Sequence, residues 1–165
     1  MSINVIVDHL SVVVAAICLT LVFGLPCGIL AYFNKTFKVV IFKITDVLQT
    51  IPSLALLGII MIFLGGNKLT VVVGLFLLLP VVRNTYTGLS GIDPAVKEAA
   101  KGMGMGKLYQ LIHVELPIAF PVIFTGIRIA VINQISAAVF GTFVGGGGLG
   151  TVIYRGMANM KMKLI

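Results

Sequence analysis

Two long runs without a charged residue constrain this chain more than any other feature. Residues 10–34 and residues 47–67 contain no Asp, Glu, Lys or Arg. A helix needs about 20 mostly apolar residues to cross the hydrocarbon layer, so each run is long enough to span a membrane. Hydrophobic residues make up 59% of the chain and charged residues 10%, against about 45–50% and 25% in soluble domains. We therefore expect an all-α, multi-pass membrane protein with about four or five transmembrane segments.

The breaks between apolar runs divide the chain into expected spans. These cover about residues 10–34, 46–66, 69–86 and 116–142 of one transmembrane domain, residues 1–165. Gly65-Gly66-Asn67 is a turn signal, so the second and third spans should form a hairpin. Residues 141–156 are rich in glycine, which costs about 1 kcal/mol per residue in a helix relative to alanine. We expect this segment either to re-enter the membrane or to cross it.

Lysine and arginine are distributed unevenly over the segments between the spans. Seven lie in the first and third of these segments: Lys35, Lys38, Lys43, Arg83, Lys97, Lys101 and Lys107. Only Lys68 lies in the second. Cytoplasmic segments carry the excess of such residues, so the first and third should face the cytoplasm and the N-terminus the exterior. The net charge of +7 therefore indicates membrane orientation and does not indicate nucleic-acid binding.

The third segment, residues 87–115, has local structure of its own. Asp93 and Pro94 suit the N-cap and first turn of a helix. The helix should carry one apolar stripe, formed by Val96, Ala99, Ala100 and Met103. Its charged residues, Lys97, Glu98 and Lys101, should face away from this stripe. Three glycines, at 102, 104 and 106, should end it before a second short helix over residues 107–115. We call these two helices and the elbow between them, residues 93–115, the knob. Alternatively, the stripe belongs to an amphipathic helix lying on the bilayer.

The order of residues in this segment resembles the cytoplasmic coupling loop of bacterial ABC importer permeases. The motif consists of Glu98, Ala99, Ala100 and Gly104, followed by Leu116 and Pro117. Val114 is the one departure, since that family usually has Ile there. The resemblance implies a type I permease fold in which the loop at residues 87–115 docks onto an ATPase subunit. It also implies that ATP is bound by that partner and that this chain carries no cofactor.

Other stretches resemble permeases of the glycine betaine, carnitine and choline group. They are residues 48–58 and residues 83–88 leading into Asp93-Pro94-Ala95. The resemblance implies an importer for such a compatible solute in the cell membrane, surrounded by lipid. It also implies two protein partners besides the ATPase: an exterior solute-binding protein and a second permease chain, identical to this one or different. Another small solute, such as ergothioneine, methionine or another amino acid, is the alternative, and a stand-alone channel or secondary transporter is a further one.

Similar permeases carry one more helix after the fourth span. Beyond residue 142 this chain has no further apolar run of about 20 residues. We therefore expect the C-terminal helix to be missing and the C-terminus to lie outside the cell.

Arg128 and the glycine run are candidates for the translocation path or the interior of the bundle. An arginine inside a span costs about 2.5–3.5 kcal/mol on insertion scales, so Arg128 should face protein or water. It suits an ion pair or a carbonyl contact, with Asp46 or Glu115 as partner, or else the solute itself. Gly147 and Gly148 belong either to a flexible exterior loop or to a broken helix beside the path.

The polar residues form no pattern typical of catalysis. Glu98 and Glu115 lie on separate expected helices, and no Ser/His/Asp or metal-ligand spacing occurs in the sequence. Cys18 and Cys27 are nine positions apart in one expected helix, on nearly opposite faces, so they should not pair. We expect a transport protein and not an enzyme.

Overall fold

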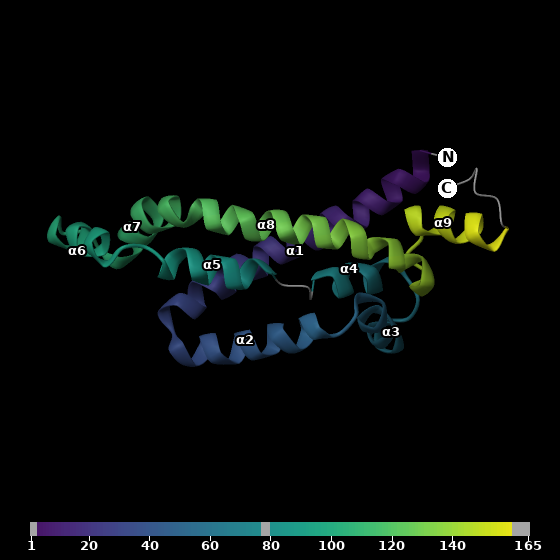
Figure 1. Cartoon of the computed structure of the whole chain (residues 1–165), viewed down its shortest axis with the longest axis horizontal. Coiled ribbons are helices and arrows are strands. Elements are labelled where there is room, and N and C mark those ends of the chain that lie inside the picture. Colours follow the sequence, from purple (N-terminus) through teal and green to yellow (C-terminus); the bar gives the residue numbers. More distant parts are fainter. Residues whose placement is uncertain (1–2, 77–79, 160–165) are drawn as a thin grey trace.

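The computed structural model describes residues 3–76 and 80–159, and within these residues the chain is helical and contains no strand (Figure 1). The α-helices are α1 (Ile3–Phe33), α2 (Lys35–Thr50), α3 (Ser53–Leu64), α4 (Lys68–Phe76), α5 (Pro80–Ser90), α6 (Pro94–Gly102), α7 (Lys107–Gln110), α8 (Leu116–Ala138) and α9 (Leu149–Ala158). A π-helical turn, η1 (Leu111–Glu115), joins α7 to α8, and a 3₁₀ helix, η2 (Val139–Val144), follows α8. The expected all-α fold is confirmed.

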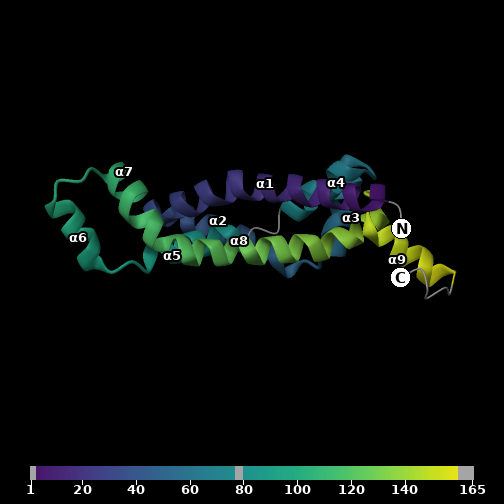
Figure 2. The same ribbon diagram turned by 90° about the horizontal axis from the view of Figure 1, so that it is seen from above.

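Helices α1, α5 and α8 form the body of an elongated bundle, with α6 at one end and α9 at the other (Figures 1 and 2). Glycines let these helices approach closely. A Cβ at Gly28 of α1 would lie 2.5 Å from Thr85 Cβ of α5, and one at Gly126 of α8 would lie 2.5 Å from Asn84 Cβ. Small residues at such crossings are typical of helices packed in membranes.

Among the described residues, three helical stretches are long and apolar enough to cross a membrane: Ile3–Phe33, Lys68–Ser90 and Lys107–Val144. Residues 77–79 of the second stretch lie outside the described residues. Helices α2 and α3 provide a fourth crossing if the two helices together count as one bent span.

The segment expected to form the second span is bent, and the lysine-bearing segment before it is helical. Helices α2 and α3 meet at 104°, where Ile51 and Pro52 break the hydrogen-bonded ladder. Helix α2 already begins at Lys35, because the Asn34 side chain accepts a hydrogen bond from the Phe37 N–H at 3.0 Å. Lys38 and its neighbours therefore lie on a helix and not in a loop.

Polar contacts hold α2 against α5. The Lys38 ammonium lies 4.3 Å from the centre of the Tyr86 ring. Asp46 forms an ion pair with Arg83, whose guanidinium also lies 4.6 Å from the Phe42 ring. Cation–π contacts of this kind contribute about 0.5–1 kcal/mol at exposed sites, so together they fix the position of α2.

A buried glutamine links three helices inside the bundle. Gln134 of α8 is fully buried, and its Nε2 donates to Thr20 Oγ1 of α1 at 2.7 Å and to the Leu75 carbonyl of α4 at 3.2 Å. Around it, apolar side chains from α1, α3 and α4 form one core that includes Val13, Leu57 and Leu75.

Candidate functional site

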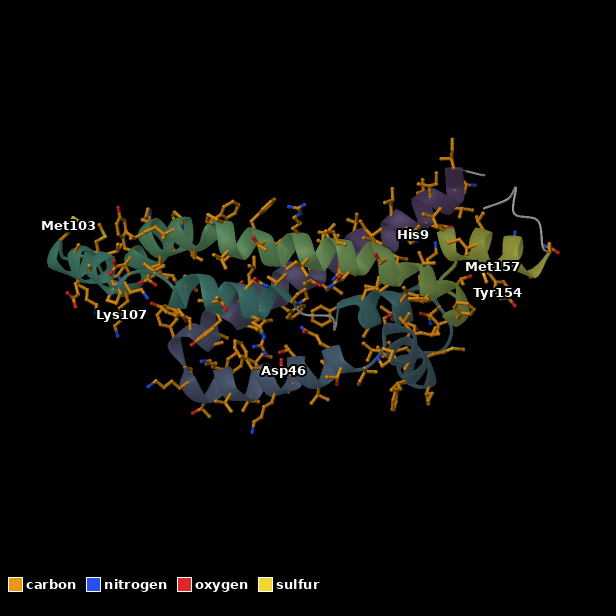
Figure 3. The ribbon with its side chains drawn as sticks, viewed as in Figure 1. His9, Asp46, Met103, Lys107, Tyr154 and Met157 are labelled. Atoms are coloured by element: carbon orange, nitrogen blue, oxygen red, sulfur yellow. The ribbon has the colours of Figure 1, made fainter. Side chains whose placement is uncertain are left out.

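The knob, residues 93–115, lies at one end of the bundle, and its first helix projects beyond it (Figures 1 and 2). Its first helix, α6, is capped as predicted, since Asp93 Oδ1 accepts a hydrogen bond from the Ala95 N–H at 2.8 Å and Pro94 occupies the first turn. In Figure 3, Met103 and Lys107 lie at this end of the molecule, and His9 and Tyr154 lie at the other.

Gly104 forms the elbow between the two helices of the knob. Its φ is +79°, a left-handed conformation that residues with a Cβ rarely adopt. The Gly104 N–H donates to the Lys101 carbonyl at 2.9 Å and the Met105 N–H donates to the Ala100 carbonyl at 3.2 Å. These two bonds form a Schellman motif, which satisfies the free carbonyls at the end of α6. The elbow therefore has a defined geometry.

The predicted apolar stripe of α6 is divided between the interior and the surface. Ala100 is buried and Val96 is half-buried, whereas Ala99 and Met103 are exposed, Met103 to 69%. Leu108 and Tyr109 on α7 are also largely exposed, at 70% and 55%. The knob thus presents apolar side chains that the other described residues leave largely exposed, which is typical of an interaction surface. Glu98 is exposed on the same helix as Ala99.

Lys97 does not face away from the bundle as expected. Its ammonium donates to the Leu89 carbonyl at 3.1 Å and lies 4.9 Å from the centre of the Tyr32 ring. These contacts tie α6 to the end of α5 and to the end of α1. The long lysine side chain reaches past the stripe to find both partners.

The knob continues into α8 without a break. At the π-turn, the Leu116 N–H bonds to the Leu111 carbonyl, and the next residue, Pro117, has no N–H to offer the preceding turn. Leu116 is half-buried in a cluster with Leu89 and Leu111, whereas Pro117 is exposed. The expected second helix of the knob and the fourth span are therefore one continuous rod, residues 107–144.

A buried carboxylate lies where the knob meets the bundle. Glu115 is 5% exposed, and its Oε1 accepts a hydrogen bond from Gln110 Nε2 at 2.7 Å. Beside it is a hollow of about 190 Å³, lined by Tyr32, Phe33, Lys97, Lys101, Lys107, Gln110 and Glu115. Sequence reasoning missed Gln110, because an i to i+5 pair does not share a face of an α-helix; the π-turn brings the two together.

Arg128 does not contact either partner suggested from the sequence. Asp46 pairs with Arg83 and Glu115 binds Gln110. Arg128 is exposed on α8, and it makes no ion pair or side-chain hydrogen bond with any residue that the structure describes. It lines an open groove with Phe124, Ile127, Val131 and Ile132.

The glycine run forms a packed turn between η2 and α9, at the end opposite the knob (Figure 1). Gly148 is buried, and a Cβ there would lie 3.1 Å from His9 Nδ1 of α1. Gly147 and Gly148 both have positive φ, 70° and 77°. Close by, Asp8 of α1 pairs with Lys68 of α4 at 2.6 Å. Helix α1, α4 and the glycine turn are thus joined at this end.

Several known proteins are similar to this chain over most of its length. It is 47% identical to the choline transport system permease protein OpuBD of Bacillus subtilis over 137 residues, which are 82% of this chain and 61% of that protein. It is 43% identical to the glycine betaine/carnitine/choline transport system permease protein OpuCD of the same organism, over 90% of this chain and 66% of that one. The chain thus spans less than two thirds of the length of either relative.

The fold is also found among solved structures. The chain superposes on a subunit of the MetNI methionine ABC transporter, determined in inward-facing conformations, with a TM-score of 0.80 at 23% identity, over 94% of this chain and 83% of that one. Residues 20–165 also match the family described as binding-protein-dependent transport system inner membrane component. The chain therefore belongs to this family of ABC permeases, and it is a multi-pass protein of the cell membrane.

Proposed function

We propose that this chain is the permease subunit of an ATP-driven importer for a small compatible solute such as choline, glycine betaine or carnitine. The relatives at 47% and 43% identity are named as permeases for these solutes. The observation that carries the mechanism is the knob: it projects beyond the bundle, its elbow has a defined geometry, and the other described residues leave its apolar side chains largely exposed.

The contacts of the knob explain how a force on it would reach the spans. Through η1, α7 is continuous with α8, so the two helices move together. Lys97 connects α6 to the end of α5 and to Tyr32 of α1. When an ATPase subunit pushes the knob, the three helices of the bundle body tilt together, which is the motion that alternating access needs.

The partners follow from this assignment. An ATPase subunit binds ATP and covers Glu98, Ala99 and Gly104 of the knob, while Ala100 is buried within this chain and Leu116 and Pro117 anchor the knob to α8. A solute-binding protein delivers the solute outside, and a second permease chain completes the path. This chain itself holds no cofactor and catalyses no reaction. Ergothioneine or an amino acid is the alternative cargo, and a competition experiment with choline, carnitine and methionine in uptake assays separates these cases.

Charge reversal at Glu98 tests the docking surface. Glu98→Lys should leave membrane insertion intact but weaken ATPase association and uncouple hydrolysis from uptake, because the exposed carboxylate lies beside the apolar docking residues. Lys43→Glu is the matched control, since it also reverses one exposed charge but lies on α2, away from the knob. Full coupling in the Glu98 variant would refute the docking surface.

A further inference from the structure

Two adjoining hollows lie between the α2–α3 bend and α8. One has a volume of about 320 Å³ and the other about 250 Å³, and both are lined by Gln49 of α2 and Asn133 of α8. Ser53, Ser136 and Phe140 also line the larger hollow. Their size is close to the usual range of small-molecule sites. No charged residue lines either of them in the described part of the chain.

The bend and the periodicity of α8 bring four polar side chains to these hollows. Gln49 is the last residue but one of α2 and Ser53 is the first of α3, so the break at Ile51 and Pro52 places one on each side of it. Asn133 and Ser136 are three residues apart and share a face of α8. We call Gln49, Ser53, Asn133 and Ser136 the polar track.

Gln49 and Asn133 do not suit a surface that faces lipid. Both are exposed, and neither side chain hydrogen-bonds to any other described residue. Moving an amide from water into hydrocarbon without a partner costs about 4–8 kcal/mol. Ser136 differs, because its hydroxyl donates to the Ile132 carbonyl at 2.9 Å. The two free amides therefore mark a face that meets water or a polar solute.

Neighbouring polar residues of α8 have other surroundings. Gln134 is buried in the core and bonds to α1 and α4. Arg128 precedes Asn133 by five residues, which is about 140° around a helix. It lines a separate groove with Phe124 and Ile132. The polar track is thus distinct from the residues that the sequence pointed to.

We propose that the polar track lines the path by which the solute crosses the membrane, an inference that rests on the proposed importer function. Amide and hydroxyl groups donate to a carboxylate or hydroxyl of the solute, and amide oxygens accept weak contacts from a quaternary ammonium. With no fixed charge, the path passes a cation or a zwitterion without holding either tightly. Its position at a broken helix matches the way transporters expose polar groups inside the membrane.

Cysteine labelling tests whether the polar track is accessible to water. In the assembled transporter, with Cys18 and Cys27 replaced by serine, Asn133→Cys should react with a membrane-impermeant thiosulfonate, and excess choline should slow the reaction. Ile135→Cys is the matched control: Ile135 is 43% exposed but lies about 200° around α8 from Asn133 and lines neither hollow, so it should stay unlabelled. An unreactive Asn133→Cys would overturn the proposal.

Uptake measurements test the role in transport. Asn133→Leu should lower uptake about tenfold at unchanged protein level, as expected for one lost hydrogen bond in the rate-limiting state, while Ile132→Leu should not. Asn133→Asp should raise the ratio of choline to carnitine uptake, because a fixed negative charge attracts the cation. Normal uptake rates and an unchanged ratio of choline to carnitine uptake in both Asn133 variants would refute the proposal that the polar track lines the path. If the unaltered transporter imports none of these solutes, the proposed importer function is refuted instead. The labelling experiment then still shows whether water reaches the polar track.

Discussion

Replacing Gly104 by valine changes the backbone energy of the knob without changing its packing. Gly104 has φ of +79°, and a Cβ built there meets no atom within 4 Å. The cost of the substitution is therefore conformational and not steric. A residue with a Cβ pays about 1–2 kcal/mol in the left-handed region, and a β-branched one pays at least this much. A free-energy difference of about 1.4 kcal/mol changes an equilibrium constant tenfold. The fraction of chains in which the left-handed turn at position 104 is formed therefore falls by up to about 5–30-fold.

Gly106 provides the control within the same turn. It also has no atom within 4 Å of a built Cβ, but its φ of −68° and ψ of 153° are extended values that valine adopts readily. Gly106→Val therefore adds the same side chain, two residues away, without the conformational cost. Within this chain, therefore, the two variants differ in the cost of the left-handed backbone at position 104 and not in steric contacts.

The assay is titration of the purified ATPase subunit onto the chain in nanodiscs. If the elbow must be formed for docking, the apparent Kd rises in proportion to the loss of formed elbows. We expect an increase of up to about 5–30-fold for Gly104→Val and little change for Gly106→Val. Equal affinities of both variants, or an equal loss in both, would contradict the role of the elbow geometry.

Three further substitutions test separate contacts. Asp93→Ala removes the cap of α6 and should destabilise that helix by about 1 kcal/mol, measured as faster amide exchange there. Gln134→Leu removes the bonds to Thr20 and Leu75 and should lower the free energy of unfolding in detergent by about 1 kcal/mol, at about 0.6 kcal/mol per bond; unchanged stability would show that the bonds contribute nothing. Arg128→Ala should lower the thermal stability of the assembled transporter, or change its gating, more than it changes the ratio of choline to carnitine uptake. An altered ratio at unchanged expression would instead make Arg128 a solute contact.

Features set by a few neighbouring residues could be predicted from the sequence. The cap at Asp93 depends on one side chain and the next two residues, and the structure confirms it. The break after α6 depends on Gly104, whose positive φ follows from the missing Cβ. The apolar runs likewise predicted an all-helical chain, because a backbone in lipid must satisfy its own hydrogen bonds.

Features set by distant residues could not be predicted in the same way. The lysines near residue 38 suggested a segment between spans, yet they lie on helix α2, whose Lys38 and Asp46 contact Tyr86 and Arg83 of α5, far away in sequence. Pro52 was a usable signal for the break between α2 and α3, since a proline inside a helical run ends or kinks it. The pairing of Asp46 with Arg83 had no such signal, because the two lie 37 positions apart.

Coupled transport in one vesicle preparation tests the central claim most directly. The chain is reconstituted with the ATPase and solute-binding subunits of its own transport system, and choline accumulation and ATP hydrolysis are measured together. We expect ATP-dependent accumulation of choline that is lost in Glu98→Lys and retained in Lys43→Glu. Accumulation that proceeds without ATP, or that is unaffected by reversing the charge at Glu98, would contradict it.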